Sequence, residues 1–155
     1  MSVGSKVGTI CRRSVITVRP YEELTAAAHL MRDKHVGYLI VIEPDLPEQK
    51  VKPVGVLTDR DIVVTVVARD TDPRSLKVED VMTRQPVVIA EGDSIGSALT
   101  EMRRIGVRRL PVVDFRGHLA GVLSLDDVLD ALAAELQDVA GSIRNEQRIE
   151  GALRP

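Results

Sequence analysis

The sequence predicts an α/β fold built from one strand–helix–strand–strand–helix unit that occurs twice. Three observations lead to this prediction. Residues 7–43 align with residues 78–114 without a gap, an apolar stripe with helical spacing recurs at the same place in both copies, and each copy contains a Gly-x-x-Ser/Thr-x-x-Asp motif. Because a unit of about 60 residues is only marginally stable alone, the two copies should share an apolar face.

The first helix of each copy is predicted from apolar residues at i, i+3, i+4 and i+7. These residues are Leu24, Ala27, Ala28 and Met31 in the first copy and Ile95, Ala98, Leu99 and Met102 in the second. A short apolar run follows each helix, at residues 38–42 and 110–113, and its length is typical of a buried strand. Two strands joined by such a helix should lie parallel, with a right-handed crossover.

The alignment then shifts by five residues, because the first copy has a longer hairpin that contains three prolines. Residues 62–67 are rich in β-branched side chains and could form a strand, but their image at 128–136 has helical spacing, so we expect both to be helical. The first copy therefore spans residues 7–70 and the second residues 78–137. Residues 71–77 have the composition of a linker, and residues 138–155 form a C-terminal helical tail.

Composition and charge exclude several classes of function. The chain has 155 residues, a net charge of −2 and 2% aromatic residues, which disfavours binding to nucleic acid or to an anionic membrane. A single cysteine, Cys11, and three scattered histidines predict neither a disulfide nor a metal site. No apolar run approaches the ~18 residues of a transmembrane helix. We expect a soluble, cytoplasmic protein.

The repeated motif is Gly55, Thr58 and Asp61 in the first copy and Gly121, Ser124 and Asp127 in the second. Each motif stands where a strand ends and a helix begins, so its hydroxyl and carboxylate could form a capping box. The same geometry could bind a nucleotide, because a hydroxyl and free N–H groups at a helix start hold phosphate and a carboxylate accepts hydrogen bonds from ribose. The glycines would let a ligand approach the backbone. Both interpretations stay open on the residues alone.

Taken together, these residues resemble a tandem pair of CBS domains, also called a Bateman module. The segments Gly-Val-Leu-Thr-Asp-Arg-Asp (55–61) and Gly-Val-Leu-Ser-Leu-Asp-Asp (121–127) are similar to the nucleotide motif of that family. Residues 106–114 resemble its central strand, and residues 81–86 resemble the opening of a second repeat. The resemblance implies repeats packed through their sheets, two pseudo-symmetric clefts for adenosine compounds (AMP, ADP, ATP, NAD or S-adenosylmethionine) and a homodimer. No cofactor is implied beyond this regulatory ligand.

The resemblance also implies roles for single residues. Asp61 and Asp127 would bind ribose, and Thr58 and Ser124 would bind phosphate. Tyr38 would lie either on the adenine or in the core, and the adenine would otherwise lie near Val15 and Ile16 or near Pro86 and Val87.

The two copies differ in arginines that the resemblance implies as phosphate ligands. Arg108 and Arg109 of the second copy align with Gly37 and Tyr38, which carry no charge. We therefore predict that the Asp127 site favours more highly phosphorylated ligands, although these arginines could serve the Asp61 site instead. Four other arginines could add to a positive cleft, although long charged side chains usually coat helix surfaces: Arg12, Arg13, Arg103 and Arg104.

Two classes of function remain compatible with the sequence. A ligand-sensing regulatory module would bind an adenosine nucleotide and change conformation or assembly, whereas a dimeric scaffold would bind a target protein without a ligand. An enzyme is not expected, because no nucleophile stands beside a base. The tail continues an apolar stripe that Gly141 interrupts. It should pack on the module or on a second subunit, unless it is frayed.

Overall fold

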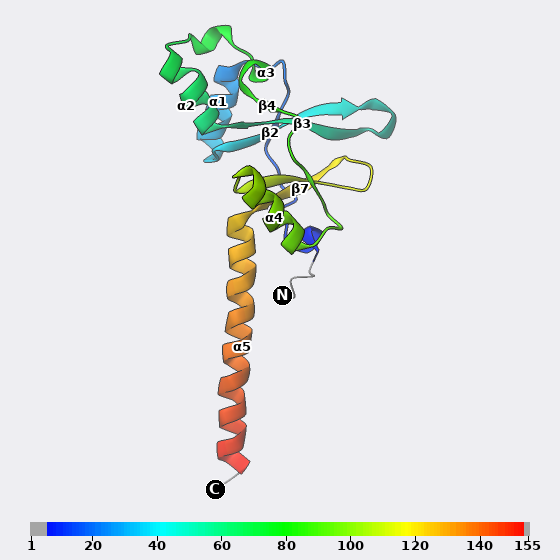
Figure 1. The fold of residues 1–155 in the computed structure, drawn as a ribbon, viewed down its shortest axis with the longest axis vertical. Helices are drawn as coiled ribbons and strands as arrows, with labels where there is room; N and C mark the ends of the chain where they lie inside the picture. Colours follow the sequence, from blue (N-terminus) through cyan, green and yellow to red (C-terminus); the bar gives the residue numbers. More distant parts are fainter. Residues whose placement is uncertain (1–5, 154–155) are drawn as a thin grey trace.

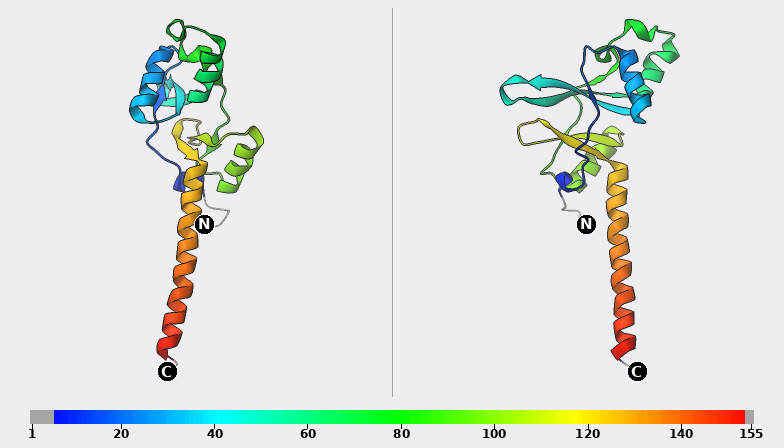
Figure 2. Two further views of the ribbon diagram at one scale, coloured as in Figure 1. Left: turned by 90° about the vertical axis from the view of Figure 1, so that its left-hand side faces the viewer. Right: turned by 180° about the vertical axis from the view of Figure 1, so that it is seen from behind.

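The computed structural model describes residues 6–153, which form two small α/β halves and one long helix (Figures 1 and 2). The first half contains β1 (Thr17–Val18), α1 (Leu24–Lys34), β2 (Tyr38–Asp45), β3 (Lys50–Thr58) and α2 (Asp59–Thr65), with 3₁₀ turns at Leu46–Glu48, Val67–Arg69 and Pro73–Ser75. The second half contains β5 (Ile89–Ala90), α4 (Ile95–Ile105), β6 (Arg109–Val113), β7 (Leu119–Ser124) and α5 (Leu125–Leu153). The predicted strand–helix–strand–strand–helix order is confirmed in both halves.

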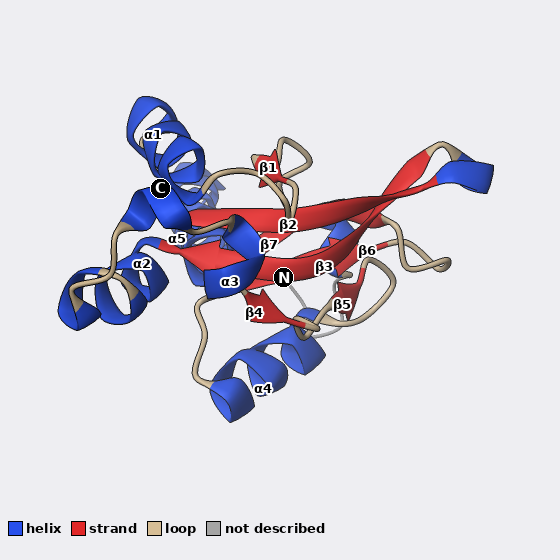
Figure 3. Cartoon of the chain, turned by 90° about the horizontal axis from the view of Figure 1, so that it is seen from above, coloured by secondary structure: helices blue, strands red, loops and turns tan. Residues whose placement is uncertain are grey.

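Each half pairs its strands in the way that the repeat predicts. β1 runs parallel to β2 across α1, and β5 runs parallel to β6 across α4, while β2–β3 and β6–β7 are antiparallel hairpins. The strands lie at the centre of the molecule, with α1, α2 and α4 outside them (Figure 3). β3 and β7 contact each other where the two halves meet.

The segments that open the two sequence repeats are exchanged between the halves. The 3₁₀ turn Val7–Thr9 packs in the core of the second half, where Arg12 also bridges to Val122 of β7. In return, α3 (Val78–Val81) packs in the core of the first half, and β4 (Thr83–Arg84) extends its sheet by pairing with β3. The chain therefore crosses between the halves twice, and neither sequence repeat is a separate packing unit.

The ambiguous segment at residues 62–67 is mostly helical, as its image predicts. α2 ends at Thr65, and a 3₁₀ turn begins at Val67. The equivalent helix of the second half is far longer, because α5 runs for 29 residues and passes through Gly141 without a break. Gly141 therefore does not interrupt the helix, and the described tail residues are not frayed. Beyond its first turns α5 extends away from both halves (Figures 1 and 2).

A polar cluster ties the hairpins of the two halves together. The buried ring of His118 lies between two carboxylates, with Nε2 3.0 Å from Asp45 Oδ2 and Nδ1 3.3 Å from Asp114 Oδ2. Lys50 and Lys52 of β3 pair with Asp114 and Asp45 at 3.0 and 2.6 Å. Because Asp45 belongs to the first half and Asp114 to the second, the cluster fixes the ends of the hairpins against each other. Among the helices of residues 6–153, none is both long enough and apolar enough to cross a membrane.

Candidate functional site

Two cavities lie between the halves, and each is lined by the hydroxyl and carboxylate residues of one copy of the repeated motif. The larger one, with a volume of about 620 Å³, is here called the Asp61 cleft. The first half contributes the start of α2 and the second half contributes the start of β6. Its lining includes the predicted site residues Gly37, Tyr38, Thr58, Asp61, Pro86, Val87, Arg108 and Arg109.

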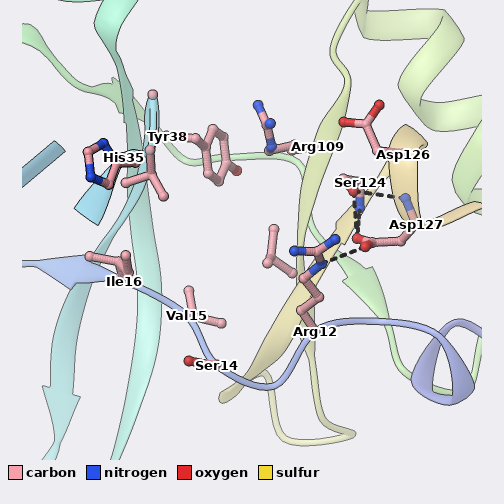
Figure 4. A pocket seen from close by; sticks show the side chains of 13 residues that line it. Arg12, Ser14, Val15, Ile16, His35, Tyr38, Arg109, Ser124, Asp126 and Asp127 are labelled. Atoms are coloured by element: carbon pink, nitrogen blue, oxygen red, sulfur yellow. Dashed lines mark hydrogen bonds and ion pairs between the residues drawn. The ribbon is translucent and has the colours of Figure 1, made fainter. Parts of the chain in front are cut away.

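The smaller cavity, with a volume of about 330 Å³, is here called the Asp127 cleft (Figure 4). It is formed by the segment before β1, the start of β2 and the start of α5. Its lining includes the predicted residues Val15, Ile16, Gly37, Tyr38, Arg109, Ser124 and Asp127. Tyr38 and Arg109 therefore border both clefts, whereas Val15 and Ile16 line only the Asp127 cleft and Pro86 and Val87 only the Asp61 cleft.

Both motifs form the capping box that was one interpretation of the sequence. In the first half, Thr58 N–H donates to Asp61 Oδ2 at 2.8 Å and Asp61 N–H donates to Thr58 Oγ1 at 3.1 Å. In the second half, Ser124 N–H and Oγ donate to Asp127 Oδ2 at 3.1 and 2.5 Å. The caps hold each carboxylate through one oxygen, so its use as a cap does not remove the other oxygen from the cleft.

The second carboxylate oxygen distinguishes the two clefts. Asp61 Oδ1 accepts no hydrogen bond within the described part of the chain, whereas Asp127 Oδ1 accepts one from Arg12 Nε at 2.6 Å. Burial of Asp127 opposes its ionisation, but hydrogen bonds from Ser124 and Arg12 outweigh burial and lower the pKa of its carboxyl. Figure 4 shows the Arg12 guanidinium against Asp127 inside the cleft. The second carboxylate oxygen of Asp127 is therefore already bound by a side chain of the protein.

The repeat alignment explains why the Asp61 cleft has no such ion pair. Residue 83 aligns with residue 12, and Thr83 stands there instead of an arginine. Thr83 lines the Asp61 cleft but cannot form an ion pair with Asp61. Arg12 was expected either to add to a positive cleft or to coat the surface, and it lines the Asp127 cleft. Its contact with Asp127 was not predicted, because that contact depends on the exchange of the entering segments.

Arg108 was predicted to lie in the Asp127 cleft, with the Asp61 cleft as the alternative, and the structure favours the alternative. Arg108 lines the Asp61 cleft and not the Asp127 cleft, because the start of β6 faces across to α2. Its guanidinium is exposed and lies 3.2 Å from Asp126 Oδ1. Arg109 borders both clefts and lies over the Tyr38 ring, 5.9 Å from its centre. Burial raises the pKa of the Tyr38 hydroxyl, so the ring stays neutral.

The two motif glycines do not leave room for a ligand, contrary to the prediction. Neither one lines a cleft. A Cβ at Gly55 would lie 2.6 Å from Met82 Sδ, and one at Gly121 would lie 2.6 Å from the Arg12 carbonyl oxygen. Their space is filled by the exchanged entering segments, so these glycines serve the packing of the halves.

Several cleft residues were not among the predicted set. Ser14 and His35 line the Asp127 cleft, and Arg60 lines the Asp61 cleft. His35 ends α1 in the left-handed conformation, which places it beside the start of β2. Arg60 lies inside the first motif, between Thr58 and Asp61, and this position in the sequence could have indicated that it lines the cleft. Among the described residues, no group of three or more His, Cys, Asp or Glu side chains could hold a metal ion.

Comparison with known proteins agrees with this architecture. The family model for the CBS domain matches residues 7–68 and 78–134. The chain is 32% identical to the CBS domain-containing protein YhcV of Bacillus subtilis over 80% of this chain and 83% of that one. It is also 32% identical to the uncharacterized protein MK0525 of Methanopyrus kandleri over 79% of this chain, which spans 60% of that relative.

Solved structures share the fold over most of their length. The CBS-pair protein CBSX2 of Arabidopsis thaliana superposes with a TM-score of 0.74 at 26% identity, covering 86% of this chain and 98% of that one. The CBS domain pair of protein MJ0100, in complex with 5′-methylthioadenosine and S-adenosyl-L-methionine, gives a TM-score of 0.71 at 20% identity, covering 85% and 98%. Two matches to one family model, on two halves that share a fold, show that this chain belongs to the CBS-domain family as a tandem CBS pair.

Proposed function

We propose that this chain is a regulatory, non-catalytic module that binds an adenosine nucleotide in the Asp61 cleft. One observation carries the proposal. Asp61 Oδ1 accepts no hydrogen bond within residues 6–153 and lies in a 620 Å³ cavity, where two arginines of the other half form part of the opposite wall. A carboxylate with a free oxygen can accept hydrogen bonds from ribose hydroxyls, and guanidinium groups bind phosphate oxygens.

Each part of the nucleotide has a matching part of the cleft. Asp61 would hold the ribose, and the Thr58 hydroxyl, which accepts a bond from Asp61 N–H, keeps its own proton to donate to a phosphate. Arg108 and Arg109 would neutralise the phosphate charge. Pro86 and Val87 supply the apolar surface for the adenine ring.

Regulation would follow from the position of the cleft between the halves. Asp61 belongs to the first half and Arg108 to the second, so a bound nucleotide contacts both. A ligand that binds one relative placement of the halves more tightly shifts the population toward it. The ligands of MJ0100 contain adenosine, which supports an adenosine compound here as well. AMP, ADP and ATP match the arginines better than uncharged adenosine does.

A second candidate function is a scaffold that binds a target protein without a ligand. The observation in its favour is that both hydroxyls and both carboxylates already serve complete capping boxes. In that case the clefts would be a by-product of packing two halves together.

Calorimetry with adenosine, AMP and ATP separates the two candidates. The regulatory module predicts binding, with ATP favoured over adenosine by the charge-assisted bonds to arginine. One such bond is worth about 1.5–3 kcal/mol, or roughly a tenfold to hundredfold difference in Kd. The Asp61→Asn variant keeps an oxygen for the cap and serves as the matched negative. Absence of binding by all three compounds would leave the scaffold as the function.

A further inference from the structure

The helix α5 carries an apolar seam that nothing in the described chain covers. Residues at a spacing of three and four form it, and the exposed fractions of its side chains are high. They are Leu129 (61%), Leu132 (41%), Leu136 (70%), Val139 (58%) and Ile143 (53%). This spacing is that of the a and d positions of a coiled coil, with Leu125 as the preceding d residue. An isolated helix with such a seam is stabilised by pairing with another helix.

Polar residues on the seam decide which orientation of a second copy fits. After Ile143 the next seam positions are Glu146 and Glu150. A parallel pair would place each glutamate against its own copy, which is unfavourable because the charges are alike. The N-terminal part of α5, which carries Asp126, Asp130, Glu135 and Asp138, faces itself in either orientation and does not distinguish them.

An antiparallel pair avoids the conflict at Glu146 and Glu150. If the two helices are aligned so that residue 134 of one lies level with residue 134 of the other, every pair of opposing seam residues from 125 to 143 is apolar. The layers are Leu125 with Ile143, Leu129 with Val139, and Leu132 with Leu136, each occurring twice. Glu146 and Glu150 of each helix then lie beyond Leu125 of the other and no longer face their own copies.

A groove at the root of α5 supplies a second, independent match. It has a volume of about 340 Å³ and lies between α4 and α5, with Leu99, Met102, Val107 and Leu125 as its apolar lining and Arg103 and Arg108 among its residues. Because Leu125 belongs both to this groove and to the seam, the two surfaces are continuous. In the antiparallel register, residues 144–153 of the other helix extend about 15 Å past Leu125, toward this groove.

The end of α5 has the chemistry that this groove would accept. Ile149 and Leu153 are exposed apolar side chains, and Glu146 and Glu150 are acidic. Arg103 makes no hydrogen bond or ion pair with any residue from 6 to 153, so its charge is available to a glutamate of another chain. We infer that two copies of this chain pair antiparallel through α5, with the last turns of each helix against the α4–α5 groove of the other.

Disulfide cross-linking between single-cysteine variants tests the orientation directly. In a Cys11→Ala background, Leu129→Cys is mixed with Val139→Cys and oxidised. The inference predicts a 129–139 disulfide between chains and little dimer from Val139→Cys alone, since in the antiparallel pair the two copies of residue 139 are about 15 Å apart along the axis. Self-linking of Val139→Cys would mean a parallel pair and would overturn the inference. A yield of the 129–139 disulfide no higher than the yield of self-linked Ala134→Cys, a position outside the seam, would also overturn the inference.

A matched pair of charge variants tests whether the seam holds the pair together. Leu132→Glu/Leu136→Glu should abolish the 129–139 cross-link, because two charges enter the apolar layers. Ala134→Glu/Gln137→Glu adds the same charge outside the seam and should leave the cross-link unchanged. Circular dichroism checks that both variants fold. Equal cross-linking of the two variants would contradict the inference, and the result does not depend on whether any nucleotide binds.

Discussion

The two clefts contain the same motif and differ in what reaches its carboxylate. Asp61 and Asp127 each cap a helix through one oxygen, at the same place in two halves of the same fold. In one cleft the remaining oxygen is open, and in the other it accepts a 2.6 Å hydrogen bond from Arg12. A ligand that bound Asp127 Oδ1 would have to displace a charged partner, whereas Asp61 Oδ1 has no hydrogen-bond donor to lose among residues 6–153.

The cause of this difference lies outside the motif. Arg12 belongs to a segment that opens the first sequence repeat but packs on the second half. The corresponding segment, which carries Thr83, packs on the first half. Two copies of one motif can thus diverge in affinity through a single residue located about 115 positions away in the chain. The motif alone gives no indication that the second carboxylate oxygen is bound in one cleft and open in the other.

The largest expected effect is that of removing the open carboxylate. Asp61→Asn should weaken nucleotide binding by roughly tenfold to a hundredfold, because it removes a charged acceptor of ribose hydrogen bonds while keeping an oxygen for the cap. Calorimetry with ATP measures the change. Asp127→Asn is the matched control and should alter the strongest binding event little. If the two variants lose affinity equally, the clefts are equivalent and the comparison fails.

The next effect concerns the glycines that pack against the exchanged segments. Gly121→Ala should destabilise the fold by about 1–3 kcal/mol, because the added Cβ would meet the Arg12 backbone carbonyl, which cannot move alone. Gly55→Ala should cost less, since its nearest neighbour is the flexible end of Met82. Urea unfolding of both variants gives the two free energies. A larger loss in Gly55→Ala would show that the Arg12 segment is not tightly held.

Releasing Asp127 should bring the two clefts closer together in affinity. Arg12→Ala frees Asp127 Oδ1, so we expect adenosine to gain about tenfold in affinity for the Asp127 cleft, equivalent to one charged hydrogen bond of about 1.4 kcal/mol. In the Asp61→Asn background, where binding to the Asp61 cleft is weakened, this gain should appear as binding to the Asp127 cleft. No gain there would mean that Arg12 does not compete with the ligand. Arg13→Ala, which changes a neighbouring arginine paired with Glu91, is the control.

The smallest effect is expected in the polar cluster around His118, at the end of β2 opposite Tyr38. This cluster joins the two halves, so its effect does not distinguish the clefts. Lys50 lowers the pKa of Asp114, and Lys52 and then His118 lower that of Asp45. A carboxyl whose pKa is lower in the folded state stabilises the fold above its unfolded pKa of about 3.9 and loses this contribution as the pH falls further. The thermal midpoint should therefore drop more steeply below about pH 4 in the native chain than in Asp114→Asn.

A control variant makes this acid test specific. Asp138→Asn removes an exposed carboxylate of α5 and should leave the pH dependence as it is in the native chain. If Asp114→Asn and the native chain have parallel profiles from pH 7 to pH 3, the cluster around His118 does not contribute to the joining of the halves.

Much of the fold could be predicted from the sequence because it depends on local periodicity. The stripe of Met31 and its image Met102 places α1 and α4, and the capping motif fixes the starts of α2 and α5. The helical assignment of residues 62–67 was correct for a related reason, since an unambiguous image existed. Signals that repeat within a few residues, or that occur twice, are readable from one chain.

The parts that were missed depend on contacts between distant segments. The exchange of the entering segments leaves no local pattern, and it decides both the role of Arg12 and the packing of Gly55 and Gly121. The cleft that Arg108 faces depends on how the halves are placed across β3 and β7. The continuity of α5 through Gly141 follows from its neighbours on the helix, because one glycine costs only about 1 kcal/mol.

The most direct test of the unequal clefts is a crystal structure of the chain grown with less than one equivalent of ATP. The account predicts density for the nucleotide in the Asp61 cleft, with ribose hydroxyls on Asp61 Oδ1, phosphates near Arg108 and Arg109, and the Arg12–Asp127 pair intact. Nucleotide in the Asp127 cleft, with Arg12 displaced and the Asp61 cleft empty, would contradict it.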